Sequence, residues 1–179
     1  MKNIAITAIL TLIACQSLPA ETPEMPPPTK EHLWLAQLAG EWESDTEIFM
    51  EPGKPPVKAK GTESIKMIGG FWAVGEANAE MMGEPWKAVS TFGYDPGKKH
   101  YISTWVDSMT STMWKYEGKM EGDVLELETE GLCMMTGEQC QFKARIEFKS
   151  PDIRTFTETK QEKDGTWVTV INATYTRKK

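Results

Sequence analysis

The chain has 179 residues and a formal net charge of −6. An acidic chain without a run of basic residues is a poor partner for nucleic acid or anionic lipid headgroups, so no nucleic-acid partner is expected. The length beyond the amino-terminal segment suits one domain with a single core.

The first residues predict an export signal. Lys2 supplies one positive charge, and an apolar run follows it. The run is shorter than the roughly 20 residues that a membrane-spanning helix needs, whereas its length is typical of a signal peptide. Residues 12–15, with the sequence LIAC, resemble the bacterial lipobox, in which the cysteine is lipidated. We expect residues 1–14 to be removed as a signal peptide and Cys15 to carry a lipid; cleavage after Ala20 is the alternative.

The next segment, residues 15–29, predicts an extended tether. It contains five of the eleven prolines of the chain. Such a composition favours polyproline II, which rises about 3.1 Å per residue. Gln16 follows the cysteine, where an aspartate would resemble an inner-membrane retention signal. We therefore expect a lipid anchor in the outer membrane, facing the periplasm, and a folded domain over residues 30–179.

One short helix and about ten strands are predicted after the tether. Residues 30–39 place Leu33, Trp34 and Leu38 at helical spacing, and Gly40 is placed to end the helix. Alternating apolar and polar residues, separated by turn sequences rich in Gly, Pro and Asp, then predict strands. These strands are 41–50, 57–68, 71–81, 86–94, 99–106, 111–119, 123–130, 140–149, 153–162 and 166–176.

Ten short antiparallel strands with tight connections are most simply wound as an up-and-down meander. Left open, such a sheet would expose two edges, and closure into a barrel removes them. The predicted fold is therefore all-β: an antiparallel up-and-down barrel of about ten strands, preceded by one short N-terminal helix. A two-sheet sandwich is the alternative.

Residues 34–130 contain a series of distinctive short motifs. They are LAGEW at 38–42, MEPGKPP at 50–56, GT at 61–62, MMGEP at 81–85, GYD at 93–95 and STWVD at 103–107. In this order they resemble the bacterial domain of unknown function 1579 family. That family is similar to the calycins, the lipocalin and fatty-acid-binding-protein barrels, which share the helix followed by Gly-x-Trp. The resemblance implies a calycin-like barrel whose floor is plugged by Trp42, and it carries no agreed activity.

Two cysteines, Cys133 and Cys140, remain once Cys15 is lipidated. An even pair in an oxidising compartment predicts a disulfide. Closing so short a loop stabilises the fold by roughly 2.5 kcal/mol in the chain-entropy model. The alternative is a copper site, because these thiols with Met134 and Met135 are soft ligands that suit Cu(I).

No catalytic motif and no cofactor site are predicted. The chain has two histidines, His32 and His100, and neither is expected inside a barrel. This scarcity argues against a histidine-based triad, a zinc site and an axial haem ligand. No glycine-rich phosphate loop is present. The acidic residues are dispersed, and an active site centred on Asp107 is a weak alternative.

The numbers of methionines and tryptophans, eleven and seven, are high for this length and are the feature of the sequence that indicates a function. Methionine suits irregular apolar surfaces, and tryptophan adds a large area with a polar group. The predicted cavity-lining residues are Met81, Trp86, Trp105, Met113 and Trp114. Ordinary core packing of these side chains is the alternative.

Together these features predict an envelope lipoprotein that binds a small hydrophobic or amphipathic ligand in a barrel cavity. Three other functions stay open. They are a protein-interaction module of the cell envelope, periplasmic copper handling, and an enzyme of unidentified reaction.

Overall fold

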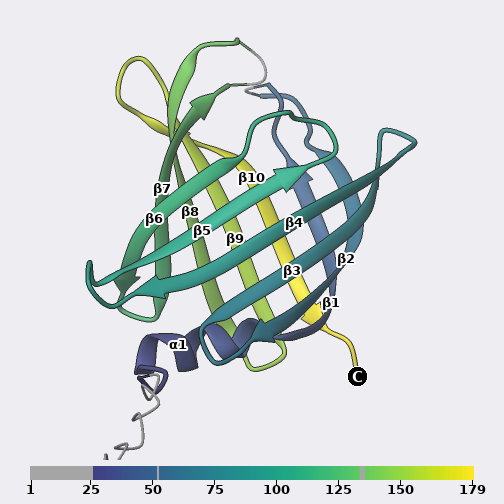
Figure 1. Ribbon diagram of the computed structural model, residues 1–179. Helices are drawn as coiled ribbons and strands as arrows, with labels where there is room; N and C mark the ends of the chain where they lie inside the picture. The colour runs from purple at the N-terminus through teal and green to yellow at the C-terminus, as the bar shows by residue number, and fades with distance from the viewer. Residues whose placement is uncertain (1–25, 52, 134–135) are drawn as a thin grey trace, which may run out of the picture.

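The computed structural model describes residues 26–51, 53–133 and 136–179. It is a closed antiparallel barrel with one short helix in front of it (Figure 1). Helix α1 spans Lys30–Leu35 and continues as the 3-10 helix η1, Ala36–Leu38. The strands are β1 Gly40–Ile48, β2 Val57–Ile68, β3 Trp72–Met81, β4 Glu84–Asp95, β5 His100–Asp107, β6 Trp114–Glu121, β7 Val124–Leu132, β8 Gln139–Ser150, β9 Ile153–Gln161 and β10 Trp167–Arg177.

Each strand pairs with its neighbours in the sequence, and β1 pairs with β10 to close the barrel. Every strand therefore has two partners, and no edge is left open. The predicted up-and-down barrel is confirmed, and the sandwich alternative is wrong. Among the described residues, no helix is both long enough and apolar enough to cross a membrane.

All ten predicted strands are present, and the clearest difference is the start of β6. The predicted strand begins at residue 111, whereas β6 begins at Trp114. Asp107 explains the delay, because its Oδ1 accepts hydrogen bonds from the backbone N–H groups of Met109 at 2.8 Å and Thr110 at 2.9 Å. These bonds hold a turn at the end of β5 and keep the following residues out of the ladder.

The helix is shorter than predicted, and its apolar face is different. The α-helical part ends at Leu35, and Leu33 is 64% exposed instead of buried. The buried residues are His32, Leu35 and Leu38, which are spaced three apart. Because the second half of the segment is a 3-10 helix with three residues per turn, this spacing puts them on one side.

Helix α1 lies at one end of the barrel (Figure 1), and buried side chains plug that end. Leu35, Leu38 and Trp42 are fully buried there, and Trp42 Nε1 donates a hydrogen bond to the Leu38 carbonyl at 2.9 Å. Gly40 has a φ of 135°, which favours glycine. The expected Gly-x-Trp floor is confirmed.

Arg177 of β10 ties the last strand to this floor. Its guanidinium lies 4.1 Å from the centre of the Trp42 ring. It also donates hydrogen bonds to the carbonyls of Ala39 at 2.6 Å and Gln37 at 3.0 Å. One side chain therefore joins the end of η1, the floor and the final strand.

A buried ion pair lies above the floor. Glu63 of β2 and Arg154 of β9 form it across the barrel, and both are almost fully buried. The Arg154 guanidinium also stacks on Trp42, at 4.9 Å, and on Tyr175, at 3.8 Å. Such a pair is tolerated because each charge is neutralised by the other.

Candidate functional site

The two halves of the barrel interior differ in exposure. Near α1, the inward-facing side chains Ile65, Tyr101, Leu127 and Ile146 are buried. In the opposite half, Thr129 and Phe142 are buried, but many other inward-facing side chains are half-buried. The half-buried ones include Thr46, Ala77, Trp86, Trp105, Trp114, Tyr116, Glu158 and Ile171. A side chain that points into a closed barrel contacts solvent only where solvent enters the barrel. The half away from α1 is therefore accessible.

The connections also differ between the two ends. At the α1 end the strands are joined by short turns, such as residues 122–123 and 151–152. The opposite end has longer loops, such as residues 108–113 and 162–166. Figure 1 shows these loops extending beyond the strands, at the end opposite α1. We call this end the mouth of the barrel.

Three tryptophans form a wall inside the mouth. Trp86 of β4 and Trp105 of β5 have ring centres 5.7 Å apart. Trp105 lies directly opposite Trp114 of β6 in the ladder. The Trp114 ring meets the Phe142 ring edge-on at 5.4 Å. Trp86, Trp105 and Trp114, hereafter the Trp wall, combine a large apolar area with partial exposure.

The structure brings together three of the five predicted cavity residues. Trp86, Trp105 and Trp114 face inward near one another. Met81 is half-buried at the end of β3, next to the hairpin turn. Met113 lies in the loop before β6 and is 52% exposed. Ligand binding by these residues stays a prediction.

A polar pair lies one layer deeper than the Trp wall. The Tyr116 hydroxyl of β6 donates a hydrogen bond to Glu158 Oε1 of β9 at 2.9 Å. Desolvation raises the pKa of Glu158 to about 7, although the bond from Tyr116 acts in the opposite direction. Desolvation, followed by the nearby charge of Glu158, also raises the pKa of Tyr116. Burial therefore favours the neutral form of this carboxyl.

Sequence reasoning missed this pair. Tyr116 and Glu158 are 42 residues apart and come from strands that are not neighbours in the barrel. One signal was available, because Glu158 shares the parity of Phe156 in β9 and therefore points inward. A carboxylate on the inward face of a strand is unusual enough to mark a candidate site.

The barrel also has a recess of about 610 Å³ on its outer surface, over β2, β1, β10 and β9. Its outward-facing side chains form two ion pairs, Lys58 with Glu47 at 3.2 Å and Lys60 with Asp45 at 2.7 Å. These residues point away from the interior, so the recess is separate from the Trp wall. Its charged lining is typical of a solvated surface.

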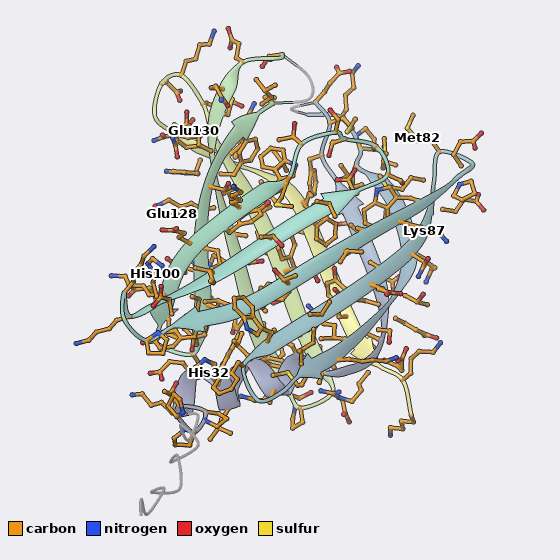
Figure 2. The ribbon with its side chains drawn as sticks, in the orientation of Figure 1. His32, Met82, Lys87, His100, Glu128 and Glu130 are labelled. Carbon is orange, nitrogen blue, oxygen red and sulfur yellow. The ribbon has the colours of Figure 1, made fainter. Side chains whose placement is uncertain are left out.

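Both histidines lie outside the barrel interior, but His32 is buried, which was not expected. Its ring packs edge-on against Phe71 at 5.1 Å and Tyr94 at 5.7 Å, between α1 and the barrel. His100 is half-buried at the start of β5 (Figure 2). Within the described ranges, no group of three or more His, Cys, Asp or Glu side chains is arranged to hold a metal ion.

Cys133 and Cys140 lie close together at the mouth, and their sulfur atoms are not bonded to one another in the structure. Desolvation and the neighbouring Cys133 raise the pKa of the Cys140 thiol. The disulfide stays a prediction. The predicted copper ligands Met134 and Met135 lie outside the described residues, as do the signal peptide and Cys15.

Comparison with known proteins identifies a family and a fold. The model of a family described as "Protein of unknown function (DUF1579)" matches residues 27–177. The crystal structure of Rv2717c from M. tuberculosis is similar, with a TM-score of 0.55 and 15% identity, over 81% of this chain and 95% of that one. The S-type phycobiliprotein lyase CPES from Guillardia theta has a TM-score of 0.56 and 14% identity, over 86% and 99%. At these identities the likeness shows the fold alone. No curated protein matches the sequence.

Proposed function

The chain belongs to the DUF1579 family of proteins of unknown function, and we propose that its barrel binds a small hydrophobic or amphipathic molecule at the mouth. The exposure of the Trp wall carries this proposal, since Leu35, Leu38 and Trp42 are fully buried at the other end of the same barrel. Apolar surface left in water costs about 25 cal/mol per Å². A ligand seated against the Trp wall removes that cost.

The shape of the interior supports the same proposal. The floor is plugged by Leu35, Leu38 and Trp42, so a ligand could reach the interior from the mouth, where space between loops suits a small molecule better than a macromolecule. The Trp wall offers apolar contacts, and the Tyr116–Glu158 pair offers polar ones deeper inside. An amphipathic ligand has an apolar part that suits the Trp wall and a polar end that suits the Tyr116–Glu158 pair.

Fluorescence titration with the neutral apolar probe N-phenylnaphthylamine tests the proposal. We expect saturable binding, and Trp114→Ala should weaken it roughly tenfold, equivalent to about 1.4 kcal/mol. Trp167→Ala is the matched control, because Trp167 is 38% exposed and faces outward on β10. If wild-type protein binds no probe and native mass spectrometry of freshly purified protein finds no ligand, the proposal fails.

We also propose that the mature protein is a lipoprotein of the bacterial envelope, attached through Cys15 to the outer membrane and facing the periplasm. The lipobox-like LIAC sequence and the proline-rich segment behind it support this address. Metabolic labelling with an alkyne fatty acid should mark the wild type and leave Cys15→Ser unlabelled. A mature chain that begins at Glu21 would show cleavage after Ala20 and overturn the anchor; recovery in the inner membrane would overturn the outer-membrane address alone.

A further inference from the structure

The polar end of the proposed ligand site carries a carboxyl that no positive side chain of the described residues neutralises. Glu158 points into the barrel from β9, and the Tyr116 hydroxyl is its hydrogen-bond donor. Across the described part of the chain, no lysine or arginine forms an ion pair with this carboxyl. The oxygen that Tyr116 does not bond is left for another donor.

The two inward-facing cations on the same strand are already engaged. Arg154, four residues before Glu158, pairs with Glu63. Lys160, two residues after it, has its Nζ 3.0 Å from Glu162 Oε1. Each of these positive charges therefore has its own carboxylate, and neither serves Glu158.

The elements packed around Glu158 add no positive charge either. Its ladder partners are Ala144 on β8 and Ile171 on β10, which are both uncharged. From β6 it faces the hydroxyl of Tyr116. Asp107, at the end of β5, also acts on that hydroxyl, and its charge is negative. The surroundings of Glu158 therefore favour a positive partner.

The Trp wall favours a positive partner as well. Trp114 lies two residues before Tyr116 on the same face of β6, so it forms the next layer toward the mouth. Trp105 stands opposite it. The face of a tryptophan attracts a cation by about 0.5 to 2 kcal/mol, depending on desolvation. A cation on its way to Glu158 passes these rings.

We propose that the barrel selects amphipathic amines: a protonated nitrogen pairs with Glu158 inside the barrel, while the apolar part of the ligand lies against the Trp wall. This inference rests on the proposed function. A ligand with a carboxylate end is disfavoured, because its charge would meet the like charge of Glu158. A neutral alcohol is neither repelled by Glu158 nor able to form an ion pair with it, so its affinity should lie between those of the amine and the carboxylate.

Affinity should also depend on pH. Burial holds the pKa of Glu158 at about 7, and a nearby ammonium group lowers the pKa of a carboxyl. Below about pH 7 the carboxyl of Glu158 is mostly protonated and must lose its proton before it pairs with the amine. Above about pH 7 it is already ionised. Affinity for an amine is therefore expected to rise from about pH 6 to about pH 8.

Three ligands with the same tail test the inference: decylamine, decanol and decanoate. At about pH 8 we expect them to displace the neutral probe in that order of affinity. Glu158→Gln preserves the shape of the side chain and should weaken decylamine roughly tenfold, equivalent to about 1.4 kcal/mol, while leaving decanol unchanged. The matched control is Glu130→Gln, because Glu130 is exposed on the outside of β7 (Figure 2).

The outcomes separate this inference from the function on which it rests. If decanoate binds as tightly as decylamine, the preference for amines is overturned and ligand binding stands. If none of the three binds, both fail together. The order of affinity of the three ligands is measured on wild-type protein, so it tests the preference for amines even if Glu158→Gln does not fold. A near-ultraviolet circular dichroism spectrum shows whether that variant is folded.

Discussion

At the scale of single residues, Trp42 joins the parts of the fold that lie far apart in the sequence. Its indole N–H bonds to the Leu38 carbonyl, and its ring lies against Arg177 and Arg154. The ring thus contacts the helical segment, the last strand and the buried ion pair.

Trp42→Ala should therefore be strongly destabilising. Removal of a buried tryptophan costs about 3 to 5 kcal/mol, because a cavity remains where the ring was. Trp167→Ala, on the outer surface, should cost below about 1 kcal/mol. Urea unfolding followed by circular dichroism gives both values. Similar losses for the two variants would contradict the role of Trp42 as the floor of the barrel.

Glu158 should make the protein less stable as the pH rises. The pKa of its carboxyl is about 7 in the fold, against an ordinary value of 4.5. Between these values the unfolded chain binds fewer protons than the folded one, so the free energy of unfolding falls with rising pH. Relative to wild type, Glu158→Gln should gain stability between about pH 5 and about pH 8. Urea unfolding of both proteins at the two pH values measures this. If the difference in unfolding free energy between Glu158→Gln and wild type is the same at both pH values, the prediction is wrong.

The floor was predictable from sequence, and the polar pairs of the interior were not. Gly40-x-Trp42 after a helix is a local pattern, so the plug followed from its residues. Glu63 and Arg154 are 91 residues apart, and Tyr116 and Glu158 are 42 apart. Alternation shows that such residues point inward. It does not show which strand they face across the barrel.

At the scale of elements, Asp107 links the end of β5 to the Trp wall. Its Oδ1 accepts the backbone N–H groups of Met109 and Thr110, and its Oδ2 accepts the Trp105 Nε1–H at 3.1 Å. One carboxylate thus holds both the turn toward β6 and the orientation of one tryptophan. The sequence predicted a strand end here and not this double role.

Two substitutions of Asp107 separate these roles. Asp107→Asn keeps an oxygen for the turn but replaces the acceptor of the Trp105 N–H, so it should change the tryptophan fluorescence and cost about 1 kcal/mol. Asp107→Ala loses the turn as well and should cost about 2 kcal/mol or more. Fluorescence spectra and urea unfolding give the comparison. If the two variants behave alike, Asp107 does not hold the turn.

The β7–β8 connection should gain stability from a disulfide. Cys133 and Cys140 lie close together where these strands are joined, and a bond between them would add roughly 2.5 kcal/mol in the chain-entropy model. Protein recovered from an oxidising compartment should resist alkylation at both positions until it is reduced. The control Cys140→Ser should expose the remaining thiol to alkylation. Labelling of both cysteines before reduction would contradict the prediction.

Element bounds were predictable wherever alternation alone sets them. The prediction for β2, residues 57–68, matches Val57–Ile68. It missed the start of β6 and the end of α1, where side-chain hydrogen bonds and a 3-10 turn decide the boundary. Interactions of this kind depend on local geometry rather than on periodicity, so the sequence pattern does not reveal them.

At the scale of the whole molecule, closure followed from the need to remove two edges, and the difference between the two ends did not. The floor and the mouth are built from the same ten strands. They differ because α1 packs on one end only, and because the longer loops gather at the other. The alternation of apolar and polar residues predicts which side chains point into the barrel. It does not predict how far solvent enters the barrel from either end. The three tryptophans were predicted from sequence, whereas their partial exposure and the polar pair behind them became visible only in three dimensions.

Closure itself is testable by removing β10. A chain ended after Gln161 leaves β1 and β9 as open edges and loses the bonds of Arg177 to the floor. Open edges pair with other chains, so this variant should form oligomers or aggregate. Size-exclusion chromatography with light scattering measures the outcome, and a chain lacking only Lys179 is the control that should stay folded with unchanged size. A folded monomer without β10 would mean that nine strands suffice, and that the β1–β10 seam is not what holds the barrel together.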